Sequence, residues 1–176
     1  MCGITGILST DPKLDKLSLV KKMSDTIRHR GPDGEGYWIN NSGDMAFGHR
    51  RLSIIDLSEN GHQPMHYAGR YTIVFNGEIY NYVELRNFLI ERNYVFKSKC
   101  DTEVILALYD LKGDDCLKDL NGMFAFAIWD DERKNLFCAR DRFGEKPFFY
   151  HYVPGKAFYF ASEMKAFWSI GISKTT

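Results

Sequence analysis

Residues 123–161 read MFAFAIWDDERKNLFCARDRFGEKPFFYHYVPGKAFYFA, a segment dominated by aromatic and aliphatic residues. Four apolar runs alternate here with turn signals such as Asp130-Asp131 and Pro154-Gly155. Short runs of this kind, bounded by turn residues, are typical of antiparallel strands. We predict strands over 123–129, 136–140, 147–152 and 157–161.

The pattern upstream of this segment is mixed. Apolar residues at helical spacing predict three helices: one that carries Val20 and Met23, one that carries Leu85 and Leu89, and one over 102–111. Shorter apolar runs predict strands at 3–8, 37–39, 45–55 and 71–75. This order of elements, within 176 residues, predicts a single domain of the α+β class with mainly antiparallel sheets covered by helices.

Composition and charge exclude several classes of protein. Hydrophobic residues make up 44% of the chain and charged residues 26%, which is typical of a globular protein with a core. Lys plus Arg and Asp plus Glu both number 23, so the formal net charge is zero. Nucleic-acid-binding and membrane-surface proteins need a positive excess, so neither class is predicted. No apolar run approaches the ~20 residues that cross a bilayer, and a signal peptide is absent, so we expect a cytoplasmic protein.

The cysteines Cys2, Cys100, Cys116 and Cys138 show no CxxC spacing, and we predict no metal site. Cys2 is distinguished by its position, because removal of Met1 would place a thiol and a free α-amine on one carbon. A thiol nucleophile needs a base, and an α-amine with a pKa of about 7.7–8.0 is neutral in roughly a tenth to a fifth of molecules at pH 7. Cys2 is therefore a candidate nucleophile that supplies its own base. If Met1 is retained, the amine is locked in a peptide bond and this base does not exist.

Other polar residues have ordinary structural interpretations beside functional ones. Asn76-Gly77 is a strong hairpin signal, and periodicity favours a turn, although an amide beside an exposed glycine N–H can also supply two donors to a developing oxyanion. Arg51 follows a predicted strand, where it is either solvated or placed to bind a substrate carboxylate through two hydrogen bonds. Asp101 precedes the 102–111 helix, which makes it a candidate N-cap.

Taken together, the motifs of this chain resemble those of the glutaminase domain of class II, or N-terminal nucleophile, glutamine amidotransferases, as in bacterial glutamine-hydrolysing asparagine synthetases. The likeness covers essentially the whole chain, in the right order and spacing. The matching segments are MCGI (1–4), RHRGPDG (28–34), GHRRLSIID (48–56), GHQPM (61–65), FNGEIYN (75–81), DTEVIL (101–106), GMFAFA (122–127), RDRFGEKP (140–147) and ASEMKA (161–166).

The resemblance implies a four-layer αββα sandwich, with two antiparallel sheets between helical layers. It implies that Cys2 is the nucleophile and that the Asn76 side chain and the Gly77 backbone N–H hold the oxyanion. It also implies a substrate-binding set: Arg51 pairs with the α-carboxylate, Asp101 takes the α-ammonium with Glu78 nearby, and Leu52 and Ile55 complete the set. The motifs at 28–34 and 140–147 are expected to have structural or interface roles.

The resemblance further implies that the substrate is L-glutamine and that its ammonia passes to a C-terminal synthetase domain or partner subunit. This chain lacks the Ser-Gly-Gly-x-Asp-Ser pyrophosphate loop of such a domain, so residues 1–176 are expected to be the N-terminal glutaminase part of a longer synthetase. ATP and Mg²⁺ are expected only in the synthetase domain, with no cofactor in this one, and a homodimer stays open. Two alternatives remain: a non-catalytic domain used for binding or assembly, and an N-terminal nucleophile hydrolase that acts on another amide.

Overall fold

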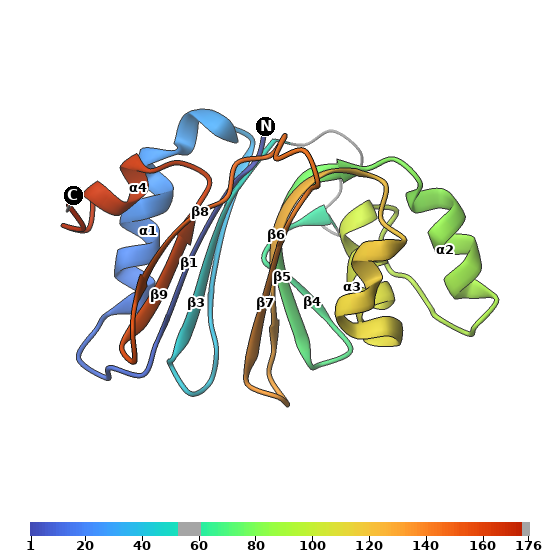
Figure 1. The fold of residues 1–176 in the computed structure, drawn as a ribbon, viewed down its shortest axis with the longest axis horizontal. Helices are drawn as coiled ribbons and strands as arrows, with labels where there is room; N and C mark the ends of the chain where they lie inside the picture. The colour runs from blue at the N-terminus through green and yellow to red at the C-terminus, as the bar shows by residue number, and fades with distance from the viewer. Residues whose placement is uncertain (53–60, 174–176) are drawn as a thin grey trace.

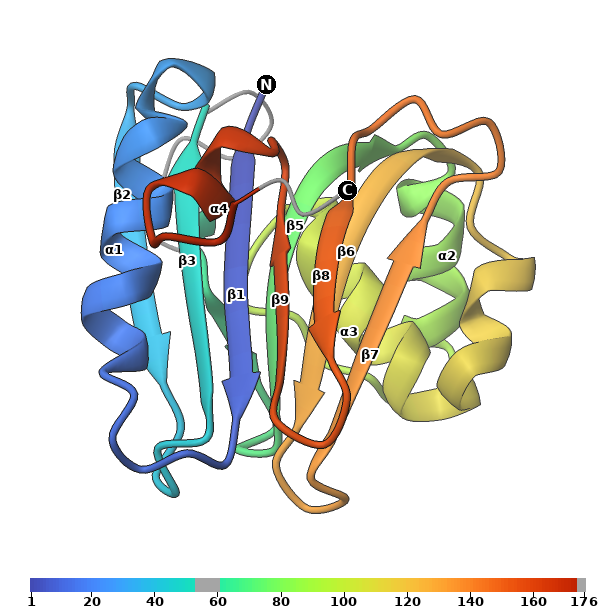
Figure 2. The ribbon, with the colours of Figure 1, turned by 60° about the vertical axis from the view of Figure 1, so that its left-hand side comes forward.

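The computed structural model describes residues 1–52 and 61–173, and its layers are visible edge-on in Figure 1. Two antiparallel β-sheets stack face to face, and helices cover the outer face of each sheet. Figure 2, turned by 60°, shows helices α1 and α4 in front of the first sheet. The prediction of an α+β fold with four αββα layers is confirmed.

The first sheet has five strands in the order β2-β3-β1-β9-β8. They are β1 (Gly3–Ser9), β2 (Gly34–Ile39), β3 (Met45–Arg51), β8 (Phe149–Val153) and β9 (Ala157–Ala161). In the central strand β1, Gly3 lies opposite Arg50 of β3, and Thr5 lies opposite Ala161 of β9. Pairing on both sides fixes the start of β1, and Cys2 directly precedes that start.

The second sheet has four strands in the order β4-β5-β6-β7. They are β4 (Met65–Tyr67), β5 (Tyr71–Ile79), β6 (Gly122–Asp130) and β7 (Asn135–Arg140). Within the described residues, β4 pairs with β5 from Met65 opposite Ile73 to Tyr67 opposite Tyr71. The later part of β5 therefore extends past β4, and its outer edge is left to side chains from elsewhere in the chain.

Each sheet carries two α-helices on its outer face. The helices α1 (Lys16–Thr26) and α4 (Lys165–Trp168) cover the first sheet, and α2 (Tyr82–Ile90) and α3 (Asp101–Lys112) cover the second. Two short 3₁₀ helices, η1 (Arg28–Arg30) and η3 (Gly113–Lys118), follow α1 and α3. The three helices predicted from apolar spacing are confirmed as α1, α2 and α3. Across the described ranges, no helix has the length and apolar character that a membrane span requires.

Three apolar clusters fill the spaces between the four layers. One lies between the first sheet and its helices and includes Ile7, Val20, Met23 and Phe167. The second lies between the sheets and includes Ile4, Phe47, Val74, Ala127 and Trp129. The third lies between the second sheet and its helices and includes Ile73, Phe75, Leu89, Val104 and Ile105. Because both faces of each sheet are covered, strands such as β5 contain consecutive apolar residues and not a simple alternation.

The turn expected at Asn76-Gly77 is wrong. Both residues lie inside β5, where Asn76 is opposite Ala125 and Gly77 is opposite Phe124 of β6. A Cβ on Gly77 would lie only 2.3 Å from the carbonyl oxygen of Met123. Glycine at this position therefore permits the close approach of two strands, and the long pairing with β6 outweighs the local hairpin signal.

The N-cap role expected for Asp101 is also wrong. Helix α3 begins at Asp101 itself, and the residue at the N-cap position is Cys100. The carboxylate of Asp101 instead accepts a hydrogen bond from the backbone N–H of Ile79 in β5, at 3.0 Å. This contact ties the start of α3 to the end of β5.

Candidate active site

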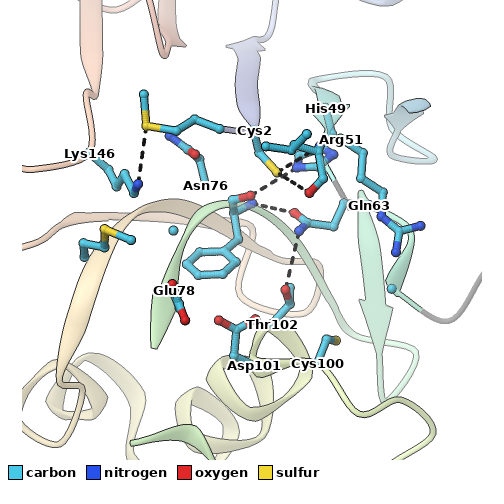
Figure 3. Close-up of a pocket in the computed structure, with 16 residues that line it drawn as sticks. Cys2, His49, Arg51, Gln63, Asn76, Glu78, Cys100, Asp101, Thr102 and Lys146 are labelled. Atoms are coloured by element: carbon cyan, nitrogen blue, oxygen red, sulfur yellow. Dashed lines mark hydrogen bonds between the residues drawn. The ribbon is translucent and has the colours of Figure 1, made fainter. Parts of the chain in front are cut away.

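A cavity of about 220 Å³ lies at the end of the molecule where β1 begins. Both sheets line it, with Arg51 from the first sheet and Asn76 from the second, while Cys2 lies directly before β1 and Asp101 and Thr102 contribute from the start of α3. Figure 3 shows these side chains around a common space. The cavity is smaller than the ~300–1,000 Å³ of sites for drug-sized molecules, so it suits a small metabolite.

The cavity brings together the site residues expected from the sequence. Seven of them line it: Cys2, Arg51, Leu52, Asn76, Gly77, Glu78 and Asp101. The eighth, Ile55, lies outside the described residues. Stacking of the two sheets therefore joins residues that are far apart in the chain.

The thiol of Cys2 is held against the backbone of Leu52. The Leu52 N–H donates to Sγ at 3.4 Å, and the thiol donates to the Leu52 carbonyl oxygen at 3.6 Å. Burial raises the pKa of the Cys2 thiol; the Leu52 N–H and the Arg51 guanidinium partly offset this rise, and Asp101 adds to it. A thiol with a raised pKa is protonated at neutral pH, so its reactivity as a nucleophile depends on a base.

Asn76 presents a buried donor to the cavity. Its side chain is 1% exposed, and Nδ2 has no hydrogen-bond partner among the described residues. Side chains alternate along a strand, so Asn76 shares the face of Val74, which packs between the sheets on the side of Cys2. An unsatisfied buried donor costs about 1–3 kcal/mol. Its position in the cavity indicates that a bound molecule supplies the acceptor.

The backbone N–H of Gly77 faces the same cavity. On the outer edge of β5, the Phe75 N–H donates to Oε1 of Gln63 at 2.6 Å, and the Ile79 N–H donates to Asp101. Backbone hydrogen-bonding groups alternate between the two edges of an antiparallel strand. The N–H of Gly77, midway between Phe75 and Ile79, therefore lies on this outer edge and not on the edge paired with β6.

Charges of both signs line the cavity. Asp101 is 4% exposed. Its burial raises the pKa of its carboxyl to about 6, although backbone N–H donors, including that of Ile79, partly offset the rise and the charge of Glu78 adds to it. Arg51 at the end of β3 brings a guanidinium to the same space. A small molecule that carries both a cation and an anion can pair with both sets of charges.

The segment 28–34, for which we expect a structural or interface role, supports the backbone of Cys2. Nε of Arg30 donates to the carbonyl oxygen of Cys2 at 2.9 Å, and Nη1 pairs with Glu163 at 3.1 Å. Arg30 thus fixes the backbone of Cys2 from helix η1 while it is anchored to the segment after β9. The sequence gives only a weak indication of this contact, an arginine directly before Gly31-Pro32.

Two buried polar residues that the sequence did not single out support the cavity wall. Gln63 is 6% exposed and donates from Nε2 to Thr102 Oγ1 at 3.4 Å, besides its contact with Phe75. His49 is 1% exposed, and its Nε2 lies 3.1 Å from the carbonyl oxygen of Phe75, to which it donates. Burial lowers the pKa of His49 to about 3, so the ring is neutral. Nothing in the local sequence distinguishes these residues from surface polar side chains.

The segment 140–147, for which we expect a structural or interface role, also reaches the cavity. Lys146 lines the cavity and is only 7% exposed. Its Nζ donates to the sulfur of Met1 at 3.4 Å. Within residues 1–52 and 61–173 as a whole, no group of three or more His, Cys, Asp and Glu side chains is arranged to hold a metal ion.

Comparison with known proteins identifies close relatives of this chain. A putative asparagine synthetase (glutamine-hydrolyzing) 2 of Methanocaldococcus jannaschii is 45% identical over 94% of the chain, which spans 34% of that protein. Asparagine synthetase (glutamine-hydrolyzing) 3 of Bacillus subtilis is 46% identical over 94% of the chain, which spans 27% of that protein. The chain thus spans about a quarter to a third of the length of these curated relatives.

A solved structure and a family model are consistent with this relationship. The structure of glutamine phosphoribosylpyrophosphate amidotransferase from B. subtilis matches with a TM-score of 0.82 and 22% identity, over 97% of this chain and 44% of that one. At this identity the likeness shows a shared fold. The family model of the glutamine amidotransferase domain matches residues 1–175. The chain therefore belongs to the glutamine amidotransferase domain family, as its motifs predict.

Proposed function

We propose that this domain hydrolyses the side-chain amide of free L-glutamine to glutamate and ammonia, with the Cys2 thiol as nucleophile. The observation that carries the proposal is the unpartnered Nδ2 of Asn76, buried in the same cavity as Cys2 and the N–H of Gly77. Two donors beside a thiol are the arrangement that stabilises the oxyanion of an acyl transfer. The family and its glutamine-hydrolysing relatives supply the substrate class.

The first half of the reaction forms a thioester. The α-amine of Cys2, freed by removal of Met1, accepts the thiol proton as Sγ bonds to the amide carbon of glutamine. The carbonyl oxygen gains the electron pair and is stabilised by Asn76 Nδ2 and the Gly77 N–H. When the tetrahedral intermediate collapses, the C–N bond breaks, the α-ammonium returns its proton to the leaving nitrogen, and ammonia departs.

The second half consumes water. The neutral amine accepts a proton from water as its oxygen attacks the thioester carbon, and the same two donors hold the second oxyanion. The C–S bond then breaks, the thiolate recovers the proton, and glutamate leaves. Every proton transfer in this sequence uses the amine and thiol of Cys2, so the domain needs no cofactor for this step.

The charges of the cavity account for recognition of a free amino acid. Arg51 pairs with the α-carboxylate, and Asp101 pairs with the α-ammonium with Glu78 beside it, while Leu52 contributes backbone contacts near the thiol. A glutamine inside a peptide has lost both charges, and binding it would leave Arg51 and Asp101 without these partners. This requirement also disfavours an amide substrate without an amino-acid head.

The length of the relatives supports a role in ammonia supply. They are three to four times as long as this chain and are named as glutamine-hydrolysing asparagine synthetases. We assign the ammonia to a synthetase domain or partner subunit, where ATP and Mg²⁺ would activate the acceptor. Residues 1–176 are then the glutaminase domain of a longer protein.

An intact-mass measurement with a diazo-ketone analogue of glutamine tests the proposal. The expected result is a starting mass without Met1 and a single adduct, which Cys2→Ala abolishes and Cys100→Ala, a change to a second cavity thiol, preserves. Release of glutamate from free glutamine should follow the same pattern. A processed chain that forms no adduct and hydrolyses no glutamine would contradict the proposal and favour a domain used for binding or assembly.

A further inference from the structure

Lys146 is a buried cation for which the proposed reaction has no stated use. It is 7% exposed and lines the cavity together with Cys2 and Asn76. Within the described residues its Nζ has one hydrogen bond, to the sulfur of Met1, and no carboxylate lies within ion-pair distance. A buried ammonium without an anionic partner is costly to maintain. Such a cost indicates that the charge of Lys146 acts on another group in the cavity.

The position of Lys146 is imposed by its loop. The Lys146 N–H donates to Oδ2 of Asp141 at 2.9 Å, and Nε of Arg140 donates to the Lys146 carbonyl oxygen at 2.7 Å. The same Asp141 carboxylate also accepts from the N–H groups of Phe124 and Glu145. The backbone of Lys146 is therefore fixed to β6 and β7, and the side chain enters the cavity from a rigid base.

The space that Nζ faces is next to the future N-terminus. Met1 alone bridges Nζ and the backbone nitrogen of Cys2, because its sulfur touches Nζ and its carbonyl carbon is bonded to that nitrogen. Figure 3 shows Lys146 near Asn76 on one side of Cys2 and Arg51 on the other. Once Met1 is removed, Nζ loses this hydrogen bond, and an ammonium and a free α-amine face the same small cavity.

We infer that Lys146 is a positioning residue for catalysis: its ammonium disfavours a second positive charge nearby and so keeps the freed amine of Cys2 neutral and able to accept the thiol proton. The inference rests on the proposed function. A unit charge within about 10 Å in a partly buried site changes the protonation of a neighbour by about one pH unit. The fraction of amine in the basic form at neutral pH then rises several-fold.

The other charged groups around the amine do not replace this effect. Arg30 of η1 contacts the carbonyl oxygen of Cys2, and the other charged or titratable groups from packed elements that line the cavity are His49 and Arg51 of β3, Glu78 of β5 and Asp101 of α3. His49 is neutral, and Arg30 is paired with Glu163. In the proposed complex Arg51 is paired with the substrate carboxylate, and the two cavity carboxylates with its ammonium. Lys146 is the cation whose charge no substrate group neutralises.

The test is the pH dependence of kcat at saturating glutamine, measured on full chain whose mass shows that Met1 is removed. Saturation keeps Asp101 paired with substrate, so the acid limb reports the base. We expect Lys146→Met to move this limb upward by about one pH unit, with kcat about tenfold lower near pH 6 and unchanged near pH 9. Lys146→Arg should restore the profile, and Lys156→Met, an exposed lysine at the far end of the first sheet, should leave it unmoved.

Each outcome decides for or against the inference. An acid limb that stays in place in Lys146→Met, or one that moves equally in Lys156→Met, overturns it while the proposed function stands. If Lys146→Met does not fold, Lys146→Gln gives the same reading with another neutral side chain. A wild-type chain without glutaminase activity overturns the proposed function, and this inference with it.

Discussion

Asp101 and Asp141 expose little surface, 4% and 6%, but Asp101 lies deeper in the molecule and has fewer donors, and the pKa values of the two carboxyls shift in opposite directions. Asp141 accepts hydrogen bonds from four backbone N–H groups, those of Phe124, Phe143, Glu145 and Lys146. Burial alone would raise the pKa of Asp141, but these four donors outweigh it and lower that pKa. Asp101 has fewer donors, and burial raises its pKa to about 6.

This difference in hydrogen bonding distinguishes a carboxylate with a structural role from one that can still bind a ligand. The Asp141 carboxylate is surrounded by donors of its own loop, so no acceptor capacity is left for another molecule. Asp101 is buried in a cavity and accepts one cross-element hydrogen bond, from Ile79. Nδ2 of Asn76, which has no hydrogen-bond partner among the described residues, is likewise left available to a ligand in the same cavity.

The largest effect is expected for Asp101→Asn. Under the proposed function Asp101 pairs with the substrate ammonium, so removal of its charge from this buried site should lower kcat/KM for glutamine by about 10³-fold. Steady-state glutamate release measures this loss, and a mainly higher KM is expected because the residue binds a group remote from the reacting amide. An exposed aspartate such as Asp114 is the control, since Asp114→Asn should change kcat/KM by less than about twofold. A kcat/KM near the wild-type value in Asp101→Asn would remove Asp101 from the substrate site.

The same Asp101→Asn variant should be more stable than the wild type. A carboxyl whose pKa is raised on folding destabilises the folded state as pH rises from about 4 to 6, and this cost is constant above that window. At pH 7 the variant should therefore gain about 1–2 kcal/mol in free energy of unfolding, as measured by urea denaturation. Loss of activity together with a gain in stability would distinguish Asp101 from a residue that merely holds the fold.

Asn76→Ala should lower kcat by about 10²–10³-fold while KM changes little, because under the proposed function the donor acts on charge that develops in the transition state. Its stability should change by less than about 1 kcal/mol, since Nδ2 has no partner to lose in the described structure. Single-turnover acylation by glutamine measures the effect directly. A higher KM with an unchanged kcat would assign Asn76 to ground-state binding instead.

Much of the fold could be predicted from local pattern. The strands in 123–161 and the helices α1 to α3 follow from apolar runs, helical spacing and turn residues, which depend on neighbours in sequence. Asn76-Gly77 could not be placed in this way, because its strand conformation depends on pairing with β6. A dipeptide propensity carries no information about a partner that lies more than forty residues further along the chain.

Only part of the site could be predicted, because its contacts also join residues that lie far apart in the sequence. Seven of the residues that line the cavity are predicted, and they are predicted through a resemblance of motifs, because no local rule places Cys2 beside Asn76. For the motifs that contain Arg30 and Lys146 the sequence predicts structural or interface roles. Their contacts with Cys2 and Met1 span 28 and 145 residues of sequence, so no local pattern indicates them. The burial of Lys146 cannot be predicted from the sequence, because it depends on neighbours in the tertiary structure that exclude water from the side chain.

The smallest effect on catalysis and the clearest effect on stability are expected for Asp141→Asn. The amide keeps one oxygen as acceptor and turns an NH₂ group toward backbone donors, so the free energy of unfolding should fall by about 2–4 kcal/mol at pH 7. Folded enzyme at pH 8, above the acid limb, should keep kcat within about threefold of the wild type.

The pH dependence of this loss gives the sharper test. Because folding lowers the pKa of Asp141, its carboxylate stabilises the fold above the ordinary aspartate pKa, and this contribution disappears as pH falls through the lowered value. The difference between wild type and Asp141→Asn should therefore be complete at pH 7 and shrink below about pH 4, whereas the gain in Asp101→Asn should begin near pH 4 and grow toward pH 6. Urea denaturation of both variants across this range measures the two trends. Parallel trends would mean that the donor count around each carboxylate does not set its role, and the distinction between the two aspartates would fail.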